Sequence, residues 1–316
     1  MTVKSIWRGG SKIANLWDSE FEISAQLAKK VIEEQFPFLK PAAVHRVGSG
    51  WDNTIFLAND CYMFRFPRRK AAVPLIVAEN HILPQISAYI EGEVAISLPI
   101  YKGMPSEVFP YPFSGYVAIV GQTTAELAIT EKQRIAIAQP MATFLKKLHE
   151  IPFERLNGVG PDTIGRLDLT VRAPKLEKEL AILEDKKLIA EKTSYIKIIE
   201  QAKKAEKTKE AFVHGDLYFR NFLVAEKGND LAGIIDWGDL HIGNPAVDLA
   251  VAFSFFPLEG RKLFFETYGT VDGDTYCLAR FRGLYVMSYL VFYGMDIQNQ
   301  QIIDEALLSL KYIIDE

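Results

Sequence analysis

Cysteine is scarce in this sequence of 316 residues, and no long apolar run is present. The two cysteines, Cys61 and Cys277, lie far apart and match no metal-binding spacing, so we expect two reduced, buried thiols in a cytoplasmic protein. The longest apolar run, residues 246–256, contains Asp248 and Ser254 and is too short to span a bilayer. The first residues carry positive charge but no apolar stretch of signal-peptide length. We therefore expect neither secretion nor membrane insertion.

A surplus of positive charge is also missing. The formal net charge of -4 and the pI near 5.9 argue against nucleic acid as a partner, because binding to a phosphate backbone depends on clustered Lys and Arg. The same values are compatible with a cationic substrate. Neither GxxxxGK[ST] nor GxGxxG occurs, so P-loop and Rossmann folds have no support. The length and the ordinary balance of apolar and charged residues fit a soluble protein with two lobes.

The segment 211–239, AFVHGDLYFRNFLVAEKGNDLAGIIDWGD, carries the strongest signal. Three short apolar strands are each bounded by polar residues, so that Asp216, Asn221 and Asp236 project from strand ends into one place. Carboxylate and amide oxygens suit a divalent cation that holds nucleotide phosphates, and a further carboxylate suits an attacking hydroxyl. Asn221 and Asp236 are then the metal ligands and Asp216 is the catalytic carboxylate. The alternative is a β-hairpin with ordinary acids in its turns.

The spacing HGDxxxxN, followed by an apolar strand and IDWGD, resembles the catalytic and metal-binding loops of eukaryotic-like kinases in their small-molecule version. The resemblance is closest to the aminoglycoside and macrolide phosphotransferases, and it extends over nearly the whole chain. It implies an α+β, two-lobed protein-kinase-like fold with a small, mostly antiparallel β lobe and a larger, mainly helical lobe. We expect residues 1–121 to form the nucleotide-binding lobe. Residues 122–316 form the catalytic and substrate-binding lobe, with a helical insert at about 174–209.

Several residues of the first lobe are assigned to the nucleotide by this resemblance. After a helix expected over 22–36, two strand-like runs flank the turn GSGWDN, whose glycines allow backbone N–H groups to approach phosphate oxygens. A plain hairpin turn remains the alternative. Arg65 stands where kinases place a lysine that holds phosphates, and Glu79 on the next helix is its expected partner. A solvent-facing Arg and an exposed acid are the alternatives. The residues assigned to phosphate binding are Gly48, Ser49, Gly50, Arg65 and Glu79.

A second match to the aminoglycoside phosphotransferases is the arrangement PSxxFxxPFxGY, which runs into a strand expected over 116–120. The hinge would follow at residues 121–124, beginning with Gly121, and its backbone would receive the nucleobase. Adenine and guanine are left open. Beyond the hinge, apolar periodicity predicts a helix over 130–150 and a helical pair within 174–209.

Other polar residues of the second lobe have less specific roles. We expect His214 to orient the backbone of the catalytic loop, Asp248 to support that loop, and His149 to be structural. Arg220 approaches the transferring phosphoryl group or makes an outward ion pair. Three acids are candidates for contacts with the substrate: Asp239, Asp272 and Asp296.

The sequence therefore predicts a cytoplasmic O-phosphotransferase that moves the γ-phosphate of ATP or GTP, with Mg²⁺, to a hydroxyl of an aminoglycoside-type antibiotic. A macrolide kinase and a metabolic small-molecule kinase are alternatives within the class. A nucleotide-binding pseudokinase without turnover is the alternative from another class, and Arg65 is the feature that favours it. Nucleic acid and membrane are not expected partners.

Overall fold

The computed structural model describes residues 20–50, 52–92, 94–124, 126–207 and 209–315, and the chain divides into two units. The first unit contains the described residues up to 80 together with 98–118, and the second contains 81–97 and the residues from 119 onward. Helix α2 (Val73–Ile86) runs across this division. Residues 81–97 thus belong to the second unit, and the expected lobe boundary at 121 stays a prediction.

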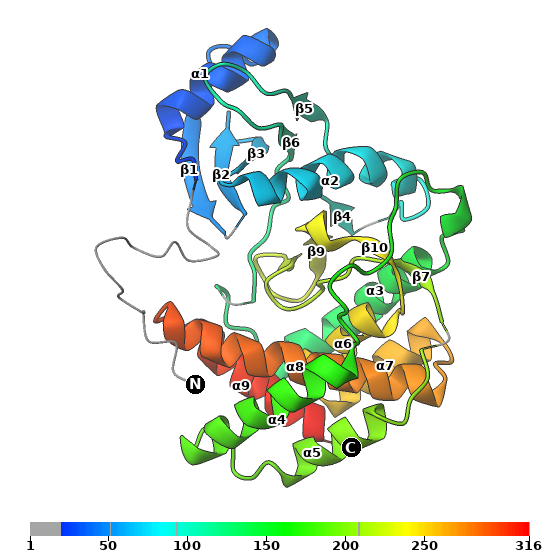
Figure 1. The fold of residues 1–316 in the computed structure, drawn as a ribbon. Coiled ribbons are helices and arrows are strands. Elements are labelled where there is room, and N and C mark those ends of the chain that lie inside the picture. Colours follow the sequence, from blue (N-terminus) through cyan, green and yellow to red (C-terminus); the bar gives the residue numbers. More distant parts are fainter. Residues whose placement is uncertain (1–19, 51, 93, 125, 208, 316) are drawn as a thin grey trace. The chain divides into compact units, whose positions relative to one another are not determined.

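The first unit is built on a five-stranded antiparallel sheet (Figure 1). Its strands, in spatial order, are β1 (Val44–Ser49), β2 (Asn53–Ala58), β3 (Tyr62–Pro67), β6 (Phe113–Val117) and β5 (Tyr101–Gly103). The strand expected over 116–120 thus begins at Phe113 and ends at Val117. The pair β1–β2 confirms the two runs predicted around the glycine-rich turn.

Aromatic side chains fill the space between this sheet and helix α1 (Ala25–Gln35). Phe64 and Phe66 alternate along β3, which puts both rings on one face of the sheet because side chains repeat every second residue. The ring of Phe66 stacks on Phe113 with centroids 4.4 Å apart. Helix α1 confirms the helix predicted over 22–36, and it ends before Pro37, which disfavours helical backbone in the residue ahead of it.

The second unit is mainly helical. Its helices are α3 (Glu131–His149), α4 (Leu169–Asp185), α5 (Thr193–Ala202), α6 (Ala246–Ser254), α7 (Leu258–Tyr268), α8 (Gly273–Asp296) and α9 (Gln300–Ile314). Two small sheets complete it: β4 (Ala95–Ile96) with β9 (Leu231–Ile234) and β8 (Phe222–Val224), and β7 (Ala211–Val213) with β10 (His241–Gly243). Short 3-10 helices cover Pro37–Leu39, Lys70–Ala72, Phe153–Arg155 and Trp237–Asp239.

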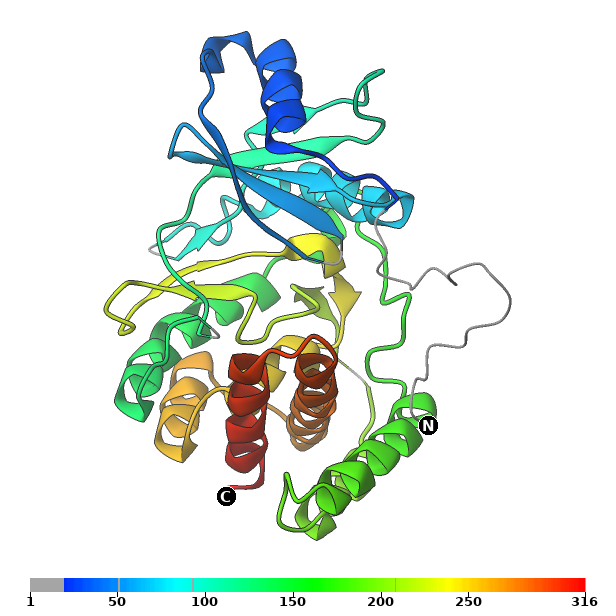
Figure 2. The same cartoon turned by 90° about the vertical axis from the view of Figure 1, so that its left-hand side faces the viewer.

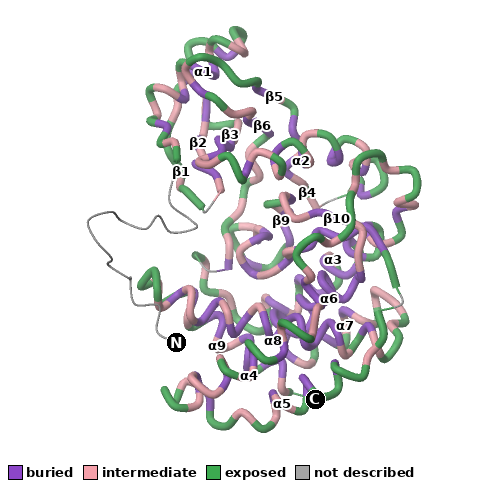
Figure 3. The backbone as a smooth tube through the Cα atoms, viewed as in Figure 1, coloured by how far each residue is buried: buried purple, intermediate pink, exposed green. Residues whose placement is uncertain are grey.

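The predicted helices of this unit are confirmed. Helix α3 starts at a capping box, in which Thr130 accepts from the backbone N–H of Gln133 and the Gln133 side chain accepts from the backbone N–H of Thr130. Helices α4 and α5 form the expected pair. Helices α8 and α9 lie side by side (Figure 2), and α6, buried along its whole length, packs against α8 (Figure 3). The predicted α+β class, with an antiparallel sheet followed by a helical region, is confirmed.

The structure bears on two expectations drawn from the scarcity of apolar runs and of cysteine. Among the described residues, no helix combines the length and the apolar character needed to cross a membrane. The expectation of two buried thiols is wrong, because Cys61 is exposed and Cys277 is half-buried. Cys61 follows Asn59 and Asp60, both at positive φ, and therefore sits in the tight β2–β3 turn, where side chains face solvent.

Candidate active site

Strand pairing explains why the three polar residues predicted to act together do lie together. Strand β8 pairs with β9 so that Phe222 lies opposite Ile234. Because the two strands are antiparallel, Asn221, just before β8, lies beside Ile235, just after β9. The backbone N–H of Ile235 donates to Asn221 O at 3.0 Å. Asp236 is the next residue, at φ 63° and ψ 64°, a left-handed conformation that few residues other than glycine adopt.

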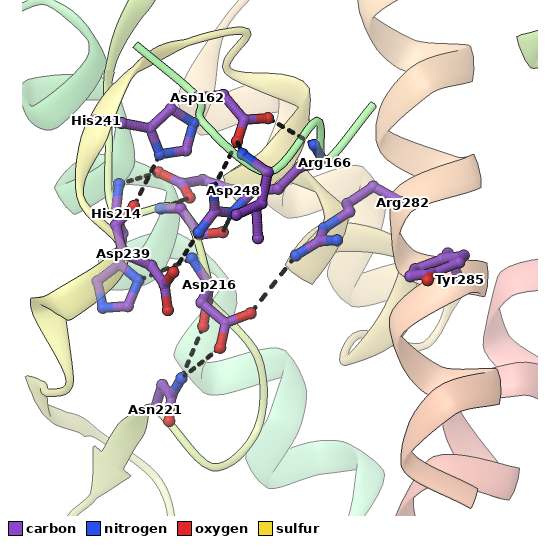
Figure 4. A network of polar contacts seen from close by, with 12 residues as sticks. Asp162, Arg166, His214, Asp216, Asn221, Asp239, His241, Asp248, Arg282 and Tyr285 are labelled. Carbon is purple, nitrogen blue, oxygen red and sulfur yellow. Dashed lines mark hydrogen bonds and ion pairs between the residues drawn. The ribbon is translucent and has the colours of Figure 1, made fainter. Parts of the chain in front are cut away.

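Asp216 and Asn221 are in direct contact (Figure 4). The side-chain amide of Asn221 donates to the backbone oxygen of Asp216 at 2.8 Å and lies 3.4 Å from its carboxylate. Since the amide nitrogen is engaged there, the Asn221 side-chain oxygen is directed away from Asp216. This arrangement gives the loop one amide oxygen and one carboxylate, Asp236, of the hard-donor type that Mg²⁺ prefers.

The predicted catalytic loop, residues 214–221, is held in place by Asp248, which is fully buried. Its carboxylate accepts from the backbone N–H of His214 at 2.7 Å and of Gly215 at 2.9 Å, and from His149 Nε2 at 3.1 Å. Burial alone raises the pKa of Asp248, but His149, His214 and the Gly215 N–H outweigh it and lower that pKa below its ordinary value. The predicted supporting roles of Asp248 and His149 are confirmed.

The histidine and glycine that precede Asp216 have separate structural reasons. His214 Nε2 donates to Ile235 O at 3.0 Å, and His214 Nδ1 accepts from the backbone N–H of Asp216 at 3.3 Å, which confirms its predicted orienting role. Gly215 has φ +90°, and a Cβ there would lie 2.2 Å from Asp239 O. Only glycine fits, because both the conformation and the approach exclude a side chain.

Sequence reasoning missed Arg166, which joins three parts of the site. Its Nε donates to Gly215 O at 2.9 Å, one Nη donates to Asp162 at 2.7 Å, and the other Nη forms an ion pair with Asp239. Arg166 is buried, so its charge is compensated by these two carboxylates. His241 extends the network, with Nδ1 donating to Asp239 O at 2.7 Å, and burial lowers the pKa of His241.

The second residue that sequence reasoning missed is Arg282, in the middle of α8. Its Nη2 lies 3.5 Å from the Asp216 carboxylate, and 7% of Arg282 is exposed. Burial, followed by the negative charge of Asp239, raises the pKa of Asp216 to about 7, although the positive charges of Arg282 and Arg166 oppose this shift. A carboxyl group with this pKa can accept a proton near neutral pH.

In the first unit, Arg65 and Glu79 form the expected ion pair, with Nη1 2.7 Å from the carboxylate. Both are buried, so the alternatives of a solvent-facing Arg and an exposed Glu are wrong. Gly48 lies in β1 and Gly50 in the following turn, where its N–H donates to Asn53 O at 2.9 Å and its carbonyl accepts from Arg68 at 2.9 Å. Contact of these residues with phosphate stays a prediction.

The expected hinge is partly occupied by protein contacts. Both backbone groups of Gln122 pair with Val224, at 3.0 Å for its N–H and 2.9 Å for its carbonyl. The N–H of Thr123 donates to Glu126 at 3.1 Å. A Cβ on Gly121 would lie 2.8 Å from Val224 O, which accounts for the glycine. These backbone groups of Gln122 and Thr123 are therefore engaged within the protein, and contact of the other backbone groups of residues 121–124 with a nucleobase stays a prediction.

The acids expected to face a substrate do not converge. Asp272 caps α8, accepting from Thr275 N and from Thr275 Oγ1, both at 2.9 Å, and Asp296 ends the same helix. A helix of 24 residues separates them, a distance of about 36 Å at 1.5 Å per residue, with Arg282 in between. Asp272 and Asp296 therefore cannot bind one small molecule beside Asp216. This corrects the sequence-based expectation, which counted acids without their positions.

The two remaining candidates are closer to the loop. Asp239 is ion-paired with Arg166, and 41% of its side chain is exposed. The Arg220 guanidinium lies 5.5 Å from the ring centroid of Tyr293. Within the described parts of the chain Arg220 makes no ion pair, so the outward-pair alternative has no support. Substrate contact at Asp239 and phosphoryl contact at Arg220 stay predictions.

The sequence profile of the phosphotransferase enzyme family matches residues 43–284. The chain belongs to this family. The prediction of a phosphotransferase is thereby confirmed, and solved structures confirm the kinase-like fold. Wild-type aminoglycoside 2'-phosphotransferase IIIa in complex with GDP superposes with a TM-score of 0.68 at 21% identity, covering 92% of this chain and 99% of that chain. A macrolide 2'-phosphotransferase from Brachybacterium faecium gives 0.58 at 15% identity, covering 90% and 97%.

Proposed function

We propose that this phosphotransferase moves the γ-phosphate of ATP or GTP to a hydroxyl group of a small molecule, with Asp216 as the catalytic carboxylate. One observation carries the proposal: a single loop and the strand pair behind it bring Asp216, Asn221 and Asp236 together, with Asp248 fixing the loop backbone. Nucleotide complexes of structural relatives, with GDP, ATP or ADP, support the nucleotide as donor.

Asn221 and Asp236 fit a magnesium ion. Their amide and carboxylate oxygens are hard donors, and Mg²⁺ usually takes one or two protein ligands and completes its shell with water and phosphate oxygens. A bound Mg²⁺ would neutralise phosphate charge. In the part of the chain that the structure describes, no three His, Cys, Asp or Glu side chains form a cluster suited to a metal, and the proposed pair needs none.

Asp216 orients the acceptor hydroxyl and accepts its proton as the oxygen bonds to the γ-phosphorus and the bond to the nucleotide's β-phosphate oxygen breaks. Its pKa of about 7 matches this task, because the proton moves to a group that is partly unprotonated at neutral pH. In the first unit, Arg65 and the Gly48–Gly50 turn hold the phosphates, and Arg220 offsets charge on the transferred group. We propose the cytoplasm as the site of action.

The acceptor of the relatives is an aminoglycoside or a macrolide: one structural relative, 22% identical with a TM-score of 0.66, is a complex with GDP and kanamycin. Both classes therefore enter the acceptor panel. The ion pair of Arg65 with Glu79, which a lysine would make in a working kinase, supports a kinase with turnover over the pseudokinase alternative.

The test is transfer of labelled γ-phosphate from ATP and, separately, from GTP, with Mg²⁺, to aminoglycosides, macrolides and hydroxylated metabolites. Asp216→Ala should abolish transfer and keep nucleotide binding, because Asp216 touches the acceptor side of the reaction. Asp236→Asn should weaken Mg²⁺-nucleotide binding. Equal loss of nucleotide binding in both variants would contradict the division of roles.

A further inference from the structure

One face of α8 beside Asp216 carries a stripe of one cation and three aromatic rings. The stripe consists of residues at intervals of three and four, which therefore share a face of the helix: Arg282, Tyr285, Tyr289 and Tyr293. Arg282, at one end of the stripe, touches Asp216 (Figure 4). Helix α4 packs against α8, and side chains of α4 contact Tyr285, the aromatic residue that follows Arg282 in the stripe.

Two cations of α4 converge on the hydroxyl of Tyr285. Arg172 Nη1 donates to it at 2.9 Å and Lys175 Nζ at 3.3 Å. The Arg172 guanidinium lies 5.2 Å from the centroid of the Tyr285 ring, and Lys175 Nζ lies 5.3 Å from that of Tyr289. Two positive groups thus share one neutral oxygen, and half of the Lys175 side chain, 49%, is open to solvent.

These two cations lack a full counter-charge. The other acceptors of Arg172 are the carbonyls of Ile164 and Gly165, and in the described ranges it forms no ion pair with a carboxylate. The carboxylate of Glu179 lies 3.6 Å from Lys175 Nζ. Burial raises the pKa of Glu179, against the opposing effect of Lys175, which weakens this glutamate as a counter-ion.

The nearby acids, by contrast, already have partners. Asp162 and Asp239 are both ion-paired with Arg166, and Asp216 faces Arg282. Burial lowers the pKa of Arg282, and the positive charges of Arg166 and Arg172 lower it further, so the three guanidinium groups lie close enough to influence one another. An incoming ammonium group would compete with arginines for Asp162, Asp239 and Asp216. An incoming anion would meet Arg172, whose acceptors are a hydroxyl and two carbonyls, and Lys175, whose one carboxylate partner, Glu179, lies 3.6 Å away.

We propose that Arg172, Lys175 and the Tyr285 hydroxyl form a subsite for an acidic group, a carboxylate or a phosphate, of the phosphoryl acceptor. Three of the five guanidinium N–H groups of Arg172 are engaged, so two remain for a ligand, together with those of Lys175. Tyr285 follows Arg282 by three residues, with Cβ atoms about 5–6 Å apart on a helix face. The subsite therefore lies one turn along α8 from the group that touches Asp216. This inference rests on the proposed function and replaces a polycationic acceptor with a hydroxylated acid.

The test compares three alcohols of one shape and different charge: 4-(hydroxymethyl)benzoate, 4-(hydroxymethyl)benzyl alcohol and 4-(hydroxymethyl)benzylamine. Binding is measured by calorimetry with Mg²⁺ and a non-hydrolysable ATP analogue present. The acid should bind about tenfold more tightly than the alcohol, and the amine no more tightly than the alcohol. A 4-(hydroxymethyl)phenylphosphonate arm separates carboxylate from phosphate recognition.

Variants connect this preference to the subsite. Lys175→Met should lower affinity for the acid about tenfold, to that of the alcohol, and Lys175→Arg should keep the preference because it keeps the charge. Lys262→Met, an equal change of charge at an exposed position on α7, should leave all affinities unchanged. The subsite is refuted if the acid binds no better than the alcohol, if the amine binds best, or if Lys175→Met retains the preference.

Phosphate transfer to the same compounds separates the two proposals. In one outcome, binding of the acid depends on Lys175 and Mg²⁺-ATP binds normally, but no compound receives phosphate. The subsite then stands and the proposed function is overturned. If phosphate passes to the amine at least as fast as to the acid, the proposed function stands and the subsite is overturned.

Discussion

Replacing Asp248 with Asn should separate positioning of the catalytic loop from binding of nucleotide. Asp248 is fully buried and accepts from His214 N, Gly215 N and His149 Nε2 at 2.7, 2.9 and 3.1 Å. Asparagine has the same shape but one acceptor oxygen. If that oxygen takes the place of Oδ2, which serves His214 and His149, the amide nitrogen faces the N–H of Gly215, donor against donor.

The loss can be estimated from these contacts. Hydrogen bonds to a charged acceptor contribute about 1.5–3 kcal/mol each, and a buried N–H left without a partner costs about 1–3 kcal/mol. One such bond is lost and two are weakened, so we expect about 2–4 kcal/mol of destabilisation, or a melting temperature roughly 3–6 °C lower for a chain of this length. A loop displaced by about 1 Å should lower kcat about 100-fold. KM for nucleotide should change little, because Asp248 lies beneath the loop.

The assay has three readouts: urea unfolding, kcat and KM for nucleotide, and unfolding as a function of pH. The pKa of Asp248 is lower in the folded than in the unfolded chain, so its stabilising effect is complete above the unfolded pKa of about 4 and is lost as the pH falls through the folded pKa. The gap in stability between wild type and Asp248→Asn should therefore narrow in acid. Asp230→Asn, an exposed acid in the β8–β9 turn, is the control. A variant with wild-type kcat, or a gap that widens in acid, would refute the reasoning.

Three further substitutions test other parts of the structure. Glu305→Gln breaks a buried ion pair in which two guanidinium nitrogens of Arg134 bind the two carboxylate oxygens at 2.7 Å. We expect the free energy of unfolding in urea to fall by about 2–4 kcal/mol, and a fall below about 1 kcal/mol would contradict this. Arg65→Met removes the positive charge that lies 2.7 Å from the buried Glu79 carboxylate and should destabilise the protein more than Arg65→Lys does; equal losses would argue against the ion pair. Arg166 lowers the pKa of Asp216, so Arg166→Met should move the acidic limb of the kcat/KM profile to higher pH, and a shift to lower pH would oppose this assignment.

The site residues that could be predicted from the sequence are those that lie close together in the chain. Asp216, Asn221 and Asp236 lie within 21 consecutive residues and are joined by strands whose pairing follows from their apolar pattern. The pair of Arg65 and Glu79 was predictable because a strand and the following helix bring them together over 14 residues. Their geometry needed only short-range rules.

The missed residues act over longer distances in the chain. Arg166 reaches Gly215 across 49 residues and Asp239 across 73, and Arg282 reaches Asp216 across 66. Arg166 lies in the turn before α4 and Arg282 in a largely buried stretch of α8, and no periodicity of the sequence singles out either residue. One error did have a local signal: Asp272 stands three residues before Thr275 at the start of an apolar helix, a pattern typical of an N-cap. Applying that rule removes Asp272 from the substrate candidates without a structure.

Asp248, which is fully buried, and Asp216, which is half-buried, have pKa shifts in opposite directions, and this difference supports their separate roles. Asp248 receives three N–H groups, which outweigh its burial and keep it ionised at any working pH. Desolvation, followed by the negative charge of Asp239, raises the pKa of Asp216 to about 7, because the one arginine that faces it, Arg282 at 3.5 Å, does not outweigh these two effects. A group that stays charged can hold a backbone in place but cannot exchange a proton during turnover. Only Asp216 can do so near neutral pH. Desolvation raises the pKa of both carboxyl groups, and the two differ because three N–H groups outweigh desolvation at Asp248, whereas the charge of Asp239 adds to it at Asp216. A substitution that adds a hydrogen-bond donor beside Asp216 would lower its pKa and make it a poorer base.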